Sequence, residues 1–115
     1  MSVIDQELFK QNFQYFDKEI VLDIINIFIE EYASRMETLK KNIDEEDFDQ
    51  LKFNAHSLKG VIANFVAPEP QELARALEMK GANKEKDGVD ALFATLKEKA
   101  DALVEELKVL REAYQ

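Results

Sequence analysis

The chain has no cysteine, only two prolines and three glycines, and a single histidine. Without cysteine, neither a disulfide framework nor a thiolate metal site can form. No apolar run approaches the roughly 18 residues that a membrane span requires, and the first residues do not resemble a signal peptide. We therefore expect a cytoplasmic protein that does not associate with membranes.

Positive charge is also scarce. The 15 basic residues are outnumbered by 24 acidic ones, so the net charge is −9. This balance argues against nucleic acid or an anionic lipid surface as a partner. A chain of 115 residues is long enough for one hydrophobic core but too short for an ATP-binding kinase domain. We expect a single domain over residues 1–115.

Alternating runs of β-branched residues bounded by turn residues are missing, which predicts an all-α fold. Apolar residues spaced three and four apart predict helices over residues 5–13, 18–43, 45–65, 68–81 and 89–114. Asp17 and Asp44 are the expected N-caps of the second and third helices, and Gly81 is the expected stop of the fourth. Short connections predict an antiparallel four-helix bundle with a short additional N-terminal helix.

The second predicted helix is apolar around much of its first half. Ile20, Ile27 and Ile29 widen a stripe that already includes Ile24 and Ile25. We expect this helix to be central in the bundle or to expose an apolar patch at one end.

The histidine, His56, falls within the third predicted helix. Successive helical residues are about 100° apart, so Leu58 and Ile62 lie on the side opposite to His56. If that side faces the core, His56 faces solvent. Lys59 then lies at about −60° from His56 and Gly60 at about +40°, one on each flank.

This trio suits phosphoryl transfer. A neutral imidazole is a good nucleophile near pH 7, and an ammonium beside it stabilises a bound phosphoryl group. Glycine inside a helix costs about 0.5–1 kcal/mol relative to alanine. At Gly60, the missing side chain clears the path of an incoming active site. Such transfer depends on close approach and charge stabilisation. We therefore predict that His56 accepts a phosphoryl group, assisted by Lys59 and Gly60.

Less specific interpretations exist for each residue alone. A surface histidine with a nearby lysine is common, Gly60 could permit close helix packing, and Phe53 could turn into the margin of the core. Together the three residues of the trio are more specific than any one of them. The surface around them is the expected partner-binding site, and it comprises Lys52, Phe53, Ala63, Asn64 and Val66.

A family resemblance supports this interpretation. The motif His56-Ser57-Leu58-Lys59-Gly60, followed by Ala63-Asn64 and Ala67, resembles that of the histidine-containing phosphotransfer (HPt) domain. The likeness extends over about Asp17 to Glu112, and includes the segments Ile27–Tyr32 and Glu72–Glu78 and the residue Leu39.

The resemblance implies a phosphorelay intermediate with the HPt helical fold. Such a phosphocarrier accepts a phosphoryl group from a receiver-domain aspartate and passes it to another receiver domain, without kinase activity of its own. By resemblance, His56 is the phosphoacceptor, Lys59 the charge-stabilising neighbour and Gly60 the gap that admits the receiver. The implied partners are response-regulator receiver domains and hybrid histidine kinases, and the implied state is a monomer. No cofactor is expected, and one histidine gives no metal site.

Two positions depart from the family pattern. Val66 occupies a position where glycine is common, and Ile62 one where small or hydroxyl residues are usual. The helical phase points Ile62 into the core and places Val66 beside Lys59, where Val66 would reshape the docking surface. A non-catalytic docking or scaffolding bundle is therefore the alternative function. A free-standing hydrolase has no support, because no second base, nucleophile or metal cluster is expected to pair with His56.

Overall fold

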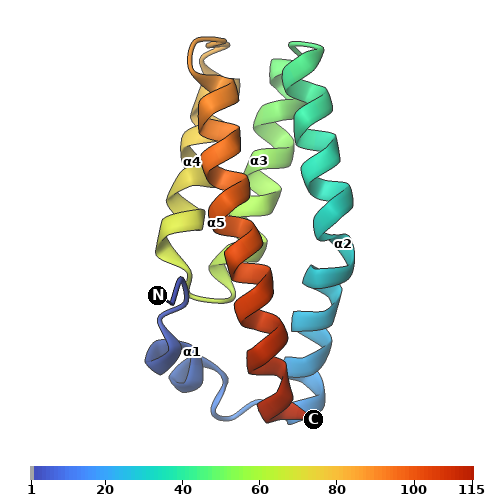
Figure 1. Cartoon of the computed structure of the whole chain (residues 1–115), viewed down its shortest axis with the longest axis vertical. Coiled ribbons are helices and arrows are strands. Elements are labelled where there is room, and N and C mark those ends of the chain that lie inside the picture. The colour runs from blue at the N-terminus through green and yellow to red at the C-terminus, as the bar shows by residue number, and fades with distance from the viewer. Residues whose placement is uncertain (1) are drawn as a thin grey trace.

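The computed structural model describes residues 2–115, and the regular secondary structure of these residues is entirely helical. Its elements are α1 (Gln6–Phe13), α2 (Lys18–Asp44), α3 (Phe48–Ala63), α4 (Pro68–Ala82), α5 (Val89–Leu110) and a 3₁₀ helix, η1 (Arg111–Tyr114). Figure 1 shows α2 to α5 side by side with alternating chain direction, and α1 near the end of the bundle that holds the C-terminus. The predicted antiparallel four-helix bundle with a short N-terminal helix is confirmed.

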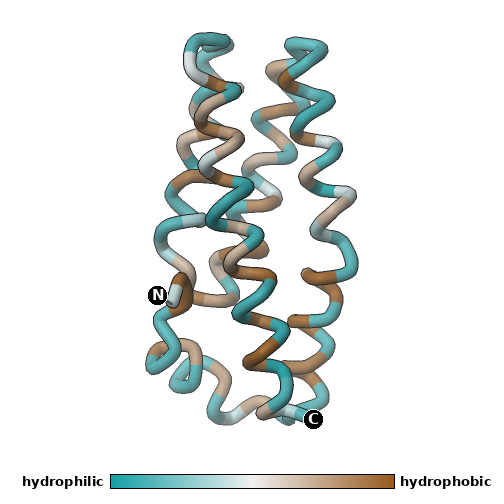
Figure 2. Tube along the Cα trace, viewed as in Figure 1, coloured by the Kyte–Doolittle hydropathy of each residue, from teal (hydrophilic) through white to brown (hydrophobic). Residues whose placement is uncertain are grey.

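The apolar stripes of the helices meet in one core. Figure 2 shows apolar residues recurring turn by turn along the long helices, interleaved with hydrophilic ones. Each large aliphatic or aromatic side chain in such a core contributes about 1.5–3 kcal/mol through burial. The largest fully buried side chains are Phe9, Phe65, Ile25, Leu39, Leu51, Leu58, Ile62, Leu77, Leu96, Leu103, Leu107 and Val21.

The first half of α2 does expose apolar surface. Ile20 and Ile27 are 46% and 53% exposed, whereas Ile25 on the same helix is completely buried. Part of the apolar stripe in α2 thus lies outside the core. No helix within residues 2–115 is both long and apolar enough to cross a membrane.

The boundary between α2 and α3 differs from the prediction. Asp44 is not the N-cap of α3 but the last residue of α2. The cap is Asp47, whose carboxylate accepts a hydrogen bond from the Gln50 amide at 3.2 Å. Several acidic residues follow one another here, and the one that satisfies a free amide of the first turn becomes the cap.

Gly81 is not the stop of α4. The helix continues to Ala82, and Gly81 lies buried against α3. A β-carbon at Gly81 would lie 2.6 Å from the backbone nitrogen of Lys52 and 2.9 Å from the carbonyl oxygen of Phe48. Glycine is therefore needed for close packing of α4 on α3, the most extensive helix contact of the bundle.

The third helix ends earlier than predicted, at Ala63. Val66 follows in the left-handed conformation, with φ of 55°, and its carbonyl oxygen accepts a hydrogen bond from the Asp5 amide at 2.8 Å. Proline in the first turn of α4 agrees with the prediction. The last predicted helix is α-helical only to Leu110 and continues as η1.

Candidate functional site

His56 lies on the outer face of α3. Its side chain is 66% exposed, whereas Leu58 and Ile62 of the same helix are completely buried. The expected outward placement of His56 and inward placement of Ile62 are therefore confirmed. A nucleophile at this position is accessible to a partner protein without any rearrangement of the bundle.

A carboxylate from the neighbouring helix contacts His56. Glu78 on α4 places Oε2 2.9 Å from Nδ1 of His56, and Oε1 2.7 Å from Nζ of Lys59. The expectation that no second base pairs with His56 is thus wrong. Glu78 lies 22 residues away in sequence and reaches the histidine only because α4 packs against α3, with Gly81 one turn further along α4.

Sequence reasoning missed Glu78, although it lies in the segment Glu72–Glu78 that carries part of the family resemblance. The usable signal was a glycine inside a predicted helix with a carboxylate three residues before it. Such a glycine permits close helix packing, and residues three apart lie on the same side of a helix. The expectation that Gly81 stops the helix conceals this signal.

Glu78 stays ionised at neutral pH. Its side chain is only 16% exposed, and this burial alone would raise the pKa of Glu78. Hydrogen bonds and charge from Lys59 and His56 outweigh that effect, so the pKa of Glu78 is lowered. A carboxylate accepts hydrogen bonds but cannot donate them. In the neutral form of His56, the proton of the ring must therefore be on Nδ1.

This arrangement leaves one ring nitrogen free to act as a nucleophile. With Nδ1–H donating to Glu78, the lone pair of a neutral imidazole is on Nε2. The second nitrogen of the ring is then available to attack an electrophile, while the contact with Glu78 orients the ring. Lys59 shares the same carboxylate, so its ammonium is held in place next to His56 rather than free in solvent.

Gly60 lies beside open space. No heavy atom lies within 4 Å of the position that a β-carbon at Gly60 would occupy. Close helix packing, the alternative explanation for this glycine, is therefore contradicted. The absent side chain at Gly60 leaves the surface one turn after His56 unobstructed.

Most of the predicted partner surface is exposed on this face. Lys52, Phe53, Ala63 and Asn64 are all exposed, and the ring of Phe53 does not turn into the core. Lys52 and Phe53 border the same shallow hollow as His56, Glu78 and Asp49. The structure thus groups part of the predicted surface around the histidine, and a partner-binding function of these residues stays a prediction.

Val66 departs from its predicted placement. The helical phase that set it beside Lys59 does not apply, because α3 ends at Ala63 and Val66 has a positive φ. Its side chain is partly buried and its carbonyl oxygen contacts the N-terminal segment through Asp5. The left-handed backbone conformation is energetically costly for a β-branched residue but not for glycine. This difference explains why glycine suits this position.

An apolar groove between α2 and α3 adjoins the site. Ile24, Ile27 and Phe28 line it on α2, and Val61 and Phe65 line it on the other side. The groove also contains Arg35 and Asn64, and Nη1 of Arg35 donates a hydrogen bond to Oγ of Ser57 at 3.0 Å. Through this hydrogen bond the groove residue Arg35 is connected to Ser57, which follows His56 in the sequence. Sequence reasoning did not identify Arg35.

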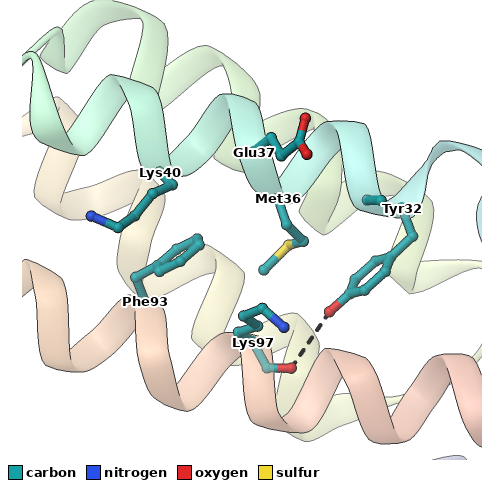
Figure 3. A pocket seen from close by; sticks show the side chains of 7 residues that line it. Tyr32, Met36, Glu37, Lys40, Phe93 and Lys97 are labelled. Atoms are coloured by element: carbon teal, nitrogen blue, oxygen red, sulfur yellow. Dashed lines mark hydrogen bonds between the residues drawn. The ribbon is translucent and has the colours of Figure 1, made fainter.

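A second hollow lies between α2 and α5 and offers no comparable chemistry. Figure 3 shows Met36 and Phe93 facing each other across it, with Tyr32 at one end. Tyr32 donates a hydrogen bond to Asp101 at 2.5 Å, and burial followed by this contact raises the pKa of Tyr32, so the phenol stays protonated. The part of the chain that the structure describes contains no cluster of three metal-ligating side chains from His, Cys, Asp or Glu.

Comparisons with known proteins identify the family and the fold. A family model described as "Hpt domain" matches residues 23–112. The fold is similar to the crystal structure of histidine-containing phosphotransfer protein B (HptB) from Pseudomonas aeruginosa PAO1, with a TM-score of 0.88 and 19% identity, over 97% of this chain and 96% of that one. No curated protein sequence matches the chain. The region matched by the family model contains His56, Lys59, Gly60 and Glu78.

Proposed function

The chain belongs to the Hpt domain family, and from this premise we propose that it accepts a phosphoryl group on His56 from a receiver-domain aspartate and passes it to another receiver domain. The observation that carries the proposal is the exposed imidazole of His56, held at Nδ1 by Glu78 with Nε2 left free. We propose a phosphocarrier without kinase activity, monomeric and cytoplasmic, whose partners are response-regulator receiver domains and hybrid histidine kinases.

In the proposed transfer, the lone pair on Nε2 of His56 attacks the phosphorus of the aspartyl phosphate. A P–N bond forms, the P–O bond breaks, and the electron pair returns to the aspartate carboxylate. Lys59 supplies positive charge beside the negatively charged phosphoryl group. Gly60 allows the receiver to approach closely enough for in-line displacement, which is the main requirement of this chemistry.

The proposed docking surface combines the exposed part of α3 with the apolar groove along α2. Two large, exposed apolar side chains contribute to this surface: Phe53 borders the same hollow as His56, and Ile27 lines the groove. Interfaces typically have an apolar centre with polar residues at the rim, and Lys52 and Asn64 would form part of such a rim. Ala63 is small enough to leave this surface open, and Val66 supports its edge from the turn after α3.

The test is incubation of the purified chain with several phosphorylated receiver domains. We expect an acid-labile, base-stable label on the wild-type chain and none on His56→Gln. Because His56 is the single histidine of the chain, the variant removes all possible phosphohistidine. Circular dichroism provides the control that the variant keeps its helical fold. Absence of label on the wild type with every receiver tested would contradict the proposal.

One observation favours a second candidate function. Val66 stands where glycine is common in the family and has a positive φ, so the residue at the turn after α3 departs from the family pattern. A receiver-docking bundle that no longer carries phosphate would tolerate this departure. Receiver binding that is equal in the wild type and in His56→Gln, with no label on either, would support this alternative.

A further inference from the structure

Glu78 is the charged group best placed to act on His56 after phosphorylation. From α4, its carboxylate reaches Nδ1 of His56 at 2.9 Å. From α3 itself, Lys59 is bound to the same carboxylate, and Asp49 and Lys52 border the same hollow. Glu78 is the least exposed member of the carboxylate–histidine–lysine contact, so solvent screens its charge least.

The protonation of Nδ1 decides how easily a phosphoryl group leaves Nε2. If Nδ1 keeps its proton, the phosphorylated ring is cationic and leaves as a neutral imidazole. If Nδ1 loses its proton, the ring must leave as an imidazolate anion, which is a much poorer leaving group. A negative charge next to Nδ1 favours the protonated form, because an opposite charge within about 4–6 Å stabilises the charged state of a titratable group.

We propose that Glu78 keeps Nδ1 protonated on phosphorylated His56, so that the phosphoryl group departs from a neutral imidazole. This inference rests on the proposed function. In the step itself, the P–Nε2 bond breaks and its electron pair stays on Nε2, while a P–O bond forms to an aspartate carboxylate of a receiver or to water. The Nδ1 proton remains on the ring, and with water as acceptor the released proton goes to solvent.

The state of Glu78 supports this inference. Lys59 and His56 lower the pKa of Glu78, so its carboxylate is ionised over the pH range in which an imidazole titrates. Glu78 thus differs from a neutral hydrogen-bond acceptor. An amide oxygen at the same place would keep the orientation of the ring but would not stabilise its positive charge. The variant Glu78→Gln therefore separates the charge of Glu78 from its hydrogen bond.

The experiment uses phosphoramidate, a small-molecule phosphoryl donor, to phosphorylate the full chain without a receiver. Cleavage of the P–N bond is then followed by ³¹P NMR from acid to alkaline pH. We expect the cleavage rate of the wild type to fall with rising pH. In Glu78→Gln this fall should occur at a pH about one unit lower. The matched control is Glu72→Gln, which removes the same charge from α4 at an exposed ion pair with Arg75. Its profile should coincide with that of the wild type.

Loss of the Glu78 carboxylate also leaves the ammonium of Lys59 unpaired. The positive charge of this ammonium by itself disfavours a cationic ring on phosphorylated His56. The same comparison is therefore repeated in the Lys59→Ala background, where this contribution is absent. A shift between Lys59→Ala and Lys59→Ala/Glu78→Gln reports on Glu78 alone. Circular dichroism, recorded at the same pH values, shows whether Glu78→Gln is folded. Should Glu78→Gln not fold, Glu78→Asp retains the charge at a greater distance and should give an intermediate shift.

The outcomes separate the two proposals. Coincident pH profiles for wild type and Glu78→Gln, in both backgrounds, would overturn the inference and leave the proposed function intact. A wild-type chain that phosphoramidate does not label on histidine would instead count against His56 as the phosphoacceptor. A label that remains in His56→Gln would do the same.

Discussion

Gly60 and Gly81 are both helical glycines near His56, yet their surroundings differ. A β-carbon at Gly60 would contact nothing within 4 Å, whereas one at Gly81 would come within 2.6 Å of the backbone of Lys52. Gly60 thus keeps the outer face of α3 open, and Gly81 lets α4 pack tightly against the same helix. The same residue type provides access in one place and packing in the other.

The packing of α4 on α3 affects the exposed surface around His56. Close contact at Gly81 brings Glu78 of α4 to His56 and Lys59, so that the geometry of the exposed histidine depends on a buried interface. Substitutions on the two faces should therefore differ in what they change. Those at the packed interface should lower stability, and those at the open face should lower the rate of transfer while stability is kept.

The largest effect on stability is expected for Gly81→Ala. The added methyl group meets backbone atoms of α3, which cannot move aside as a flexible side chain could. Overpacking of this kind costs about 1–3 kcal/mol, so we expect a loss near the upper end, about 2–3 kcal/mol. Urea denaturation followed by circular dichroism measures the loss. A variant as stable as the wild type would show that α3 and α4 are not packed as closely as the structure has them.

The matched substitution Gly60→Ala should act in the opposite direction. Its methyl group enters open space, and replacing an interior helical glycine by alanine stabilises by about 0.5–1 kcal/mol. On the proposed docking surface the same methyl group would lie in the path of a receiver domain, so the phosphoryl transfer rate should fall by about tenfold or more. Stability and single-turnover transfer rates measured on one preparation test both parts. An unchanged transfer rate would remove Gly60 from the docking surface.

Val66→Gly tests a position where the backbone favours glycine but the sequence has none. Its φ of 55° is costly for a β-branched side chain, and relief of such strain is worth about 1–3 kcal/mol. Loss of partly buried apolar surface offsets part of the gain, so we expect a net stabilisation of about 1 kcal/mol. Thermal unfolding provides the measurement. A destabilised variant would mean that the side chain of Val66 contributes more through packing than it costs in strain.

The smallest expected effect is on the pH dependence of stability in acid. The pKa of Glu78 is lowered from its ordinary value of 4.5, so its ionised form stabilises the α3–α4 contact above that pH. This contribution is lost as the pH falls below 4.5 and through the pKa of the folded state. We expect the wild type to exceed Glu78→Gln in stability by about 1 kcal/mol or less at neutral pH. The difference should vanish in acid, and a difference that persists there would contradict the ion-pair explanation.

The placement of His56 could be predicted from sequence because it depends on one helix. The burial of Leu58 and Ile62 fixes which face of α3 is inside, and a period of about 3.6 residues then places His56 outside. The bundle could be predicted for the same reason, since each helix carries its own apolar stripe.

Glu78 could not be predicted in this way, because its contact with His56 depends on how two helices pack. Helical phase gives the direction of a side chain on its own helix but not the distance to another helix. The prediction for Val66 was wrong for a related reason. It extended the phase of α3 beyond Ala63, where the helix ends and the backbone turns. A run of acidic residues likewise concealed which of Asp44 and Asp47 caps α3.

In the proposed transfer, Nε2 of His56 carries the phosphoryl group while Nδ1 contacts Glu78. Long-range ¹H–¹⁵N NMR spectra of the ¹⁵N-labelled chain, recorded before and after phosphorylation by a receiver domain, distinguish the two ring nitrogens directly. The structure predicts a proton on Nδ1 before phosphorylation and the phosphoryl group on Nε2 afterwards. A phosphoryl group on Nδ1, or an imidazole whose signals do not change, would contradict the account.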